Sequence, residues 1–135
     1  MPPVFLDTNI LLRHLRQDDP VMSPKATAIL TQIERGELQV RTTDTVIFET
    51  VFTLQRSYAQ PRELIAEALQ PLLELPGIRL PGKRIYRQVF ALYQSGRLGF
   101  ADCYHVAVMQ RLGINEILSF DSDFDRIPGV RRREA

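Results

Sequence analysis

Short apolar runs alternate along this chain with longer segments in which apolar residues recur every three or four positions. The short runs predict strands, and the longer periodic segments predict amphipathic helices bounded by capping, glycine and proline residues. The predicted strands cover residues 4–6, 38–42, 77–80 and 116–120. The predicted helices cover residues 10–15, 24–35, 44–58, 61–73, 82–96 and 101–112. We expect the first strand to be buried, and a kink or break at Pro71, which interrupts a helical pattern.

This alternation predicts the α/β fold class, with a parallel sheet covered by helices on both faces. At 135 residues the chain is long enough for one domain with a substantial hydrophobic core. No repeat, low-complexity tract or linker interrupts the pattern. We therefore expect a single domain over residues 1–135.

Composition and charge narrow the class of protein further. No stretch of 18 apolar residues and no signal-peptide pattern occurs, so we expect a cytoplasmic protein without membrane association. The lone Cys103 allows no internal disulfide and is expected in the core. The net charge is +1, with 15 Arg against 2 Lys. Arg suits phosphate oxygens, although a GC-rich genome explains the same bias, so a basic face stays open.

Four acidic segments interrupt the apolar pattern, at Asp7, Glu49, Asp102 and the cluster Asp121-Ser122-Asp123-Phe124-Asp125. A carboxylate set among buried apolar residues is costly unless something pairs with it. Asp7 follows the first predicted strand and the cluster follows the last, at the sheet edge where α/β proteins bind ligands. These acids therefore predict a pocket in which carboxylates share a divalent cation.

Each acid also has a simpler interpretation. Asp7 could equally serve as a helix N-cap, and an anion such as Asp102 is commonly found in the first turn of a helix. Glu49 could lie on an exposed polar stripe, but its apolar flanks favour a functional role. His105, one turn after Asp102, is expected to be packed or partly exposed rather than to bind metal. The terminal cluster lacks the glycine and glutamate positions of a calcium-binding loop.

Carboxylate oxygens suit Mg²⁺, with Mn²⁺ as the alternative, and no Cys/His spacing for zinc occurs. A metal held in this way can activate water and stabilise charge on a phosphodiester, so the chemistry indicated is hydrolytic phosphoryl transfer. The glycine-rich loops typical of nucleoside triphosphate and dinucleotide binding do not occur.

Four segments together resemble the PIN-domain family, and specifically the small VapC-like ribonuclease toxins of bacterial toxin–antitoxin pairs. They are FLDTNILLR, the FET around Glu49, FADCYHVAV and ILSFDSDFDRI, in this order. The resemblance implies that Asp7, Glu49, Asp102 and Asp121 are metal-binding and catalytic, with Asp123 as an accessory metal ligand. It further implies that Thr8, Asn9 and Ser119 support the site; Ser119 stands where many relatives have Thr.

The resemblance implies Mg²⁺-dependent cleavage of RNA, a homodimer and inhibition by a small cognate antitoxin protein. Two rival functions stay open: a nuclease of structure-specific DNA, and a non-catalytic module that binds RNA or protein. The terminal run Arg131-Arg132-Arg133 could grip the RNA backbone, but a solvated charge run is favoured for the last residues of a chain.

Overall fold

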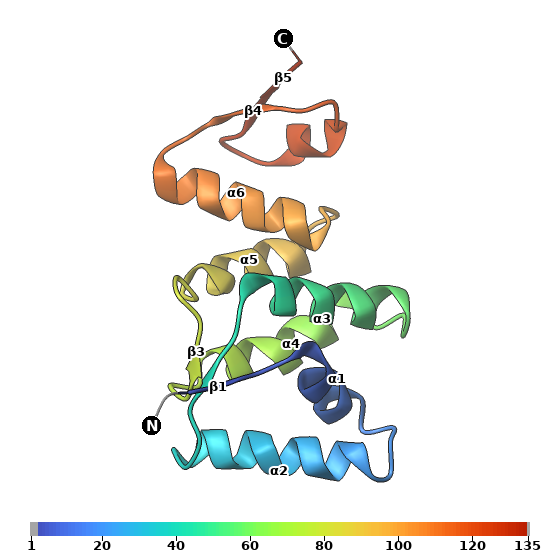
Figure 1. The fold of residues 1–135 in the computed structure, drawn as a ribbon. Helices are drawn as coiled ribbons and strands as arrows, with labels where there is room; N and C mark the ends of the chain where they lie inside the picture. The colour runs from blue at the N-terminus through green and yellow to red at the C-terminus, as the bar shows by residue number, and fades with distance from the viewer. Residues whose placement is uncertain (1–2, 135) are drawn as a thin grey trace. The chain divides into compact units, whose positions relative to one another are not determined.

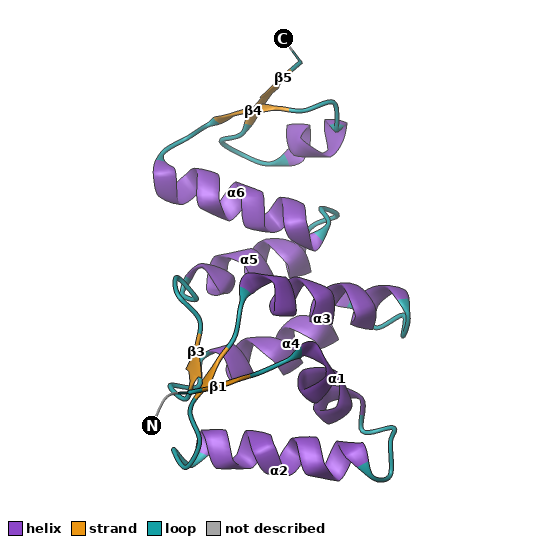
Figure 2. Cartoon of the chain, in the orientation of Figure 1, coloured by secondary structure: helices purple, strands orange, loops and turns teal. Residues whose placement is uncertain are grey.

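Strands and helices alternate in the computed structural model, which describes residues 3–134 (Figures 1 and 2). The chain divides into two compact units, Met1–Lys83 and Arg84–Ala135. Unit 1 contains β1 (Val4–Phe5), α1 (Thr8–Arg16), α2 (Met22–Glu34), β2 (Val40–Arg41), α3 (Asp44–Arg56), α4 (Arg62–Leu73) and β3 (Ile78–Arg79). Unit 2 contains α5 (Ile85–Ser95), α6 (Phe100–Leu112), β4 (Glu116–Leu118), the 3₁₀ helix η1 (Ser122–Arg126) and β5 (Arg131–Arg133).

The sheet of unit 1 is parallel, in the order β1-β2-β3, with Val4 opposite Val40 and Val40 opposite Ile78. Val40 and Ile78 are buried, whereas Val4 and Phe5 are 58% and 54% exposed. The expected burial of the first strand was therefore wrong for these two residues, and only Leu6 is buried. β1 is an edge strand of this sheet, so a neighbouring strand covers it on one side only.

The helices of unit 1 pack against one another, α1 on α2 and α3, and α3 on α4. Local signals explain their boundaries: the Thr43 hydroxyl accepts a hydrogen bond from the Val46 amide at the start of α3. α4 runs through Pro71, so the expected break does not occur. Pro71 lies in the last turn, where its missing N–H costs one hydrogen bond and the freed carbonyl belongs to the exposed residue Glu67.

Unit 2 is built on the pair α5 and α6, which pack along each other (Figure 1). Phe90 and Tyr93 of α5 are fully buried, and their ring centroids lie 5.3 and 5.4 Å from that of Phe100 at the start of α6. Cys103 is also fully buried, which confirms its expected place in the core. Gly113 ends α6 with a φ of 70°, a conformation that glycine adopts without strain.

The end of the chain differs most from expectation. Residues 131–133 form β5, which pairs in parallel with β4; Arg131 and Arg133 are exposed, as expected of a solvated run, whereas Arg132 is largely covered. η1 packs against β5. The α/β class and the parallel sheet are confirmed, while one domain over residues 1–135 stays a prediction. Within residues 3–134, no helix has both the length and the apolar character that crossing a membrane requires.

Candidate metal centre

Asp7 lies where β1 passes into α1, at the N-cap position of the helix, with extended backbone angles. Its side chain makes no capping hydrogen bond, although Asp is a favoured capping residue. The residue is exposed. The carboxylate therefore lies at a helix start without capping the helix by a hydrogen bond, so its oxygens are not occupied by the amides of α1.

Glu49 lies on the exposed side of α3, because its neighbours Ile47, Thr50 and Val51 fill the buried side. The apolar flanks do not bury Glu49, and Phe52, one turn on, is itself 59% exposed; the functional role that those flanks favoured stays a prediction. The hydroxyl of the buried Thr8 donates a hydrogen bond to Glu49 Oε2 over 3.1 Å. This bond joins the first residue of α1, next to Asp7, to the middle of α3.

Asp102 lies in the first turn of α6 and is half-buried. Burial raises its pKa above the ordinary value, the negative charges of Asp121 and Asp123 raise it further, and His105 opposes the shift. The Nδ1 atom of His105 is 3.6 Å from Asp102 Oδ1, and the His105 side chain is 58% exposed, in keeping with the expectation for this residue. Within unit 2, Asp121 and Asp123 are thus close enough to Asp102 to affect its charge.

The acidic loop of unit 2 is ordered by short hydrogen bonds. The Asp121 amide donates to Ser119 Oγ over 3.0 Å, and the Asp123 amide donates to Asp121 Oδ1 over 2.9 Å, which caps η1. Phe124 is buried and anchors the turn. Ser119 therefore has a structural link to the candidate acid Asp121, as Thr8 has to Glu49, while Asn9 is exposed on α1 and its supporting role stays a prediction.

The candidate acids are less buried than the sequence suggested. Asp7, Glu49 and Asp121 are exposed, and Asp102 and Asp123 are half-buried. They lie at strand ends, helix starts and on an open helix face, where water reaches the side chains. Burial therefore does not identify these residues as candidates. They are candidates because of their order along the chain and because they are carboxylates.

The donor set fits a hard divalent cation, because every candidate ligand is a carboxylate and the charge of Asp102 is disfavoured by burial and by two nearby acids. A cation among Asp102, Asp121 and Asp123 would relieve that repulsion. Across residues 3–134, no three Asp, Glu, His or Cys side chains converge closely enough to hold a metal as they stand. Asp7 and Glu49 belong to unit 1, and Asp102, Asp121 and Asp123 belong to unit 2.

A further pair was missed from the sequence. Arg132 Nε lies 2.9 Å from Asp125 Oδ1 and Arg132 Nη2 lies 3.2 Å from Asp125 Oδ2, a two-point contact between β5 and η1. The hydrogen bonds hold the pKa of Asp125 below its usual value and that of Arg132 above its own. The run of three arginines does not reveal which of them binds Asp125. In a strand, however, the middle side chain points to the opposite face from its two neighbours.

A cleft of about 460 Å³ opens beside Asp123 in unit 2. Its walls include the apolar side chains of Leu92, Leu98 and Ile127, and two cationic residues, Arg97 and Arg126. Asp123 is thus both a candidate metal ligand and a wall of a cleft that combines apolar surface with positive charge.

Comparison with known proteins shows the family to which the chain belongs. The family model described as PIN domain matches residues 4–130, and the chain belongs to this family. It is distantly homologous to VapC ribonucleases: it is 26% identical over 123 residues to "VapC ribonuclease" of Aquifex aeolicus (strain VF5), with 91% of this chain and 90% of that protein covered. The crystal structure of Mycobacterium tuberculosis VapC20, titled a sarcin–ricin loop cleaving toxin, matches at 21% identity and a TM-score of 0.44. That match covers 95% of this chain and 98% of the other.

Proposed function

We propose that this protein is a Mg²⁺-dependent endoribonuclease that hydrolyses RNA phosphodiester bonds in the cytoplasm, and the toxin of a toxin–antitoxin pair. The observation that carries the proposal is the complete set of PIN-type acids in family order, in a chain whose family model spans residues 4–130. Two structural facts support it: Asp7 makes no capping bond, and burial together with two further acids raises the pKa of Asp102. Distant homology to a VapC ribonuclease supports the substrate class.

The residues divide the work as follows. Asp7, Glu49, Asp102 and Asp121 are the catalytic carboxylates that hold Mg²⁺, or Mn²⁺ in its place, and Asp123 is an accessory ligand. When bound, the cation supplies an activated water and offsets charge on the phosphodiester. Glu49 or Asp121 orients the attacking water by accepting a hydrogen bond from it. Thr8 fixes one oxygen of Glu49 by donating to Oε2, and Ser119 fixes the start of the loop that carries Asp121.

A small antitoxin protein and a second copy of the chain are the proposed partners, on the strength of the VapC relationship. The alternatives are a nuclease of structure-specific DNA and a non-catalytic module. The complete acidic set disfavours the non-catalytic module, because binding without catalysis does not require five carboxylates.

The proposal is tested by incubating the purified chain with a labelled pool of total RNA, with Mg²⁺ and with EDTA. We expect discrete products with Mg²⁺ and none with EDTA, since carboxylates without their cation cannot stabilise the charge that develops on the phosphate. Parallel reactions with single-stranded and branched DNA separate the rival nuclease. Cleavage that is unchanged by EDTA would refute the metal mechanism, and no cleavage of any nucleic acid would favour the non-catalytic binding module.

The cleft beside Asp123 is the proposed position of the nucleotide that flanks the scissile phosphate. Its apolar walls suit a base or ribose, and Arg126, an exposed residue at the end of η1, suits a phosphate. Arg126→Gln is expected to raise KM about fivefold and to leave kcat within about twofold of wild type. A fivefold change in KM corresponds to roughly 1 kcal/mol of binding free energy, which is typical of an exposed charge pair.

Salt titration provides the control for this variant. Loss of one phosphate contact lowers the slope of log affinity against log salt by about 0.7 for a single strand. Arg111→Gln removes the same charge from the end of α6, outside the cleft, and should leave KM and the slope unchanged. Equal effects from both variants would show that Arg126 contributes only net charge.

A further inference from the structure

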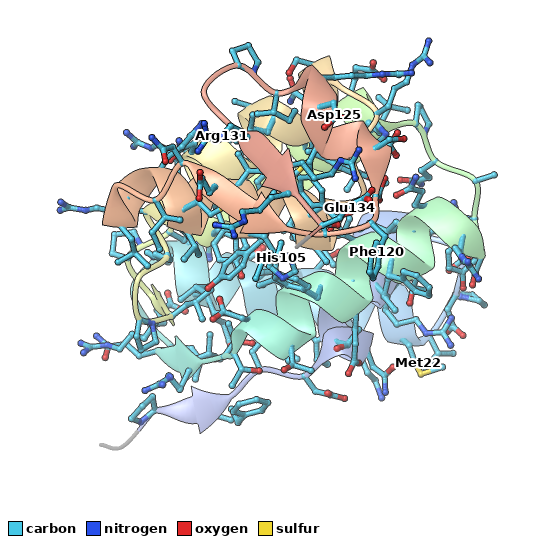
Figure 3. The ribbon with its side chains drawn as sticks, turned by 90° about the horizontal axis from the view of Figure 1, so that it is seen from above. Met22, His105, Phe120, Asp125, Arg131 and Glu134 are labelled. Carbon is cyan, nitrogen blue, oxygen red and sulfur yellow. The ribbon has the colours of Figure 1, made fainter. Side chains whose placement is uncertain are left out.

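The three terminal arginines divide into two groups because successive side chains of a strand point to opposite faces. Arg131 and Arg133 both contact Glu116 on β4, and their side chains are 79% and 55% exposed. Arg132 points the other way and is only 18% exposed. In Figure 3, Arg131 lies apart from Asp125 and Glu134, the two acidic partners of Arg132.

Arg132 contacts both ends of the loop that carries the candidate acids. Its Nη1 atom lies 3.3 Å from the backbone carbonyl of Ser119, just before Asp121. Its Nε and Nη2 atoms hold both oxygens of Asp125, at distances of 2.9 and 3.2 Å, just after Asp123. A planar guanidinium held at several points is a rigid connector, because its donors have a fixed geometry.

The backbone reinforces this connection. The Ser119 amide donates to the Arg133 carbonyl over 3.1 Å, so β5 holds the start of the loop by main chain as well as by side chain. Between the two points that Arg132 holds, Asp121 and Asp123 are already joined by the bond from the Asp123 amide to Asp121 Oδ1. Movement of Asp125 away from β5 would therefore shift η1 and with it both candidate ligands.

We propose that Arg132 is a positioning residue, which holds residues 119–125 so that Asp121 and Asp123 are arranged for binding a divalent cation. This inference rests on the proposed function, since it assigns a task to a residue outside the acidic set. It replaces the two interpretations of the arginine tail, an RNA grip or a solvated charge run, with an internal role for its middle member.

The sign of the effect separates positioning from simple charge. Removing a positive charge near a cation site should strengthen cation binding, because the Coulomb repulsion between that charge and the cation is lost. A positioning role predicts the reverse for Arg132, because the ligands lose their arrangement. Residues that orient metal ligands typically change metal affinity by about 10- to 100-fold.

The experiment measures Mn²⁺ binding to the full chain by calorimetry, without RNA, for wild type and for Arg132→Gln, with Arg131→Gln and Arg133→Gln as charge-matched controls. We expect Arg132→Gln to weaken Mn²⁺ binding at least about tenfold, and both controls to bind within about twofold of wild type. The Mg²⁺ concentration for half-maximal RNA cleavage should rise in parallel for Arg132→Gln alone. A folded Arg132→Gln chain that binds Mn²⁺ as tightly as wild type, or more tightly, would overturn the proposal.

Asp125→Asn provides the second variant, which can still refute the proposal if Arg132→Gln does not fold. It keeps the shape of the partner side chain and weakens the two-point contact, and it should also reduce Mn²⁺ affinity. In a folded double variant the two losses should not add, because both remove the same contact. Wild-type Mn²⁺ affinity in Asp125→Asn would refute the role of Arg132, whereas a wild-type chain that binds no Mn²⁺ would refute the proposed function itself.

Discussion

Asp7→Asn and Asp102→Asn are each expected to lower Mg²⁺-dependent RNA cleavage by at least about 100-fold. A bound metal contributes several kcal/mol of charge stabilisation in the transition state, and each 1.36 kcal/mol is worth about a factor of ten in rate. The measurement is kcat/KM on one RNA that the wild-type chain cleaves, at fixed Mg²⁺. One variant lies in each unit, so the pair tests both parts of the acidic set.

Neither substitution should cost much stability. Asp7 makes no capping hydrogen bond, and Asn is as good an N-cap residue as Asp. For Asp102 the raised pKa means that folding disfavours the charged form, so a neutral side chain removes the cost of burying the charge and the repulsion from Asp121 and Asp123. The lost interaction with the helix dipole is worth roughly 0.3–1 kcal/mol in the other direction, and the free energy of unfolding should stay within about 1 kcal/mol of wild type.

Glu63→Gln is the matched control for Asp102→Asn. Glu63 is an exposed acid in the first turn of α4, and it lies outside the set of candidate acids. Its replacement should leave cleavage at the wild-type rate. If Asp7→Asn or Asp102→Asn also cleaves at that rate, the corresponding residue has no place in the site.

Local signals in the sequence were sufficient for the helices. Thr43 before α3 and Gly113 after α6 determine helix ends through their own backbone and side chain, so their positions could be predicted without knowledge of the fold. Burial of strands could not be predicted in the same way. Val4 and Phe5 look like core residues, but their exposure depends on which strands flank β1.

β5 shows the same limit more strongly. Three arginines have no apolar alternation, and the strand exists because β4 offers a parallel partner and Glu116 offers a carboxylate to Arg131 and Arg133. The exposure of Glu49 likewise depends on how α3 packs against other elements, which its neighbours in the sequence do not reveal.

For the candidate site, the sequence predicted which acids to consider, because chain order and residue type carry that information. It could not predict the contacts that hold them. Thr8 and Glu49 are 41 positions apart, and the contact of Asp125 with Arg132 selects one of three identical neighbours. Such pairings depend on the tertiary path of the chain, so only the structure brings them into view.

Phe90→Ala is expected to lower the free energy of unfolding by about 3–5 kcal/mol, the usual loss for a large buried aromatic residue. Phe90 is fully buried, and its ring centroid lies 5.3 Å from that of Phe100 and 6.2 Å from that of Tyr86. Removing the ring leaves a cavity between α5 and α6 and loses the aromatic contacts. Urea unfolding followed by far-UV circular dichroism measures the change, since the chain contains no tryptophan to follow by fluorescence.

Phe120→Ala is the control, because this ring is 85% exposed and its removal should change stability by no more than about 0.5 kcal/mol. Phe90→Leu keeps most of the volume and should lose less than Phe90→Ala. The ring also bears on the site, since Phe100, its neighbour, stands two residues before Asp102 in the first turn of α6. Mn²⁺ affinity in folded Phe90→Leu should therefore fall along with stability. Equal losses of stability in Phe90→Ala and Phe120→Ala would show that the aromatic cluster does not hold α5 and α6 together.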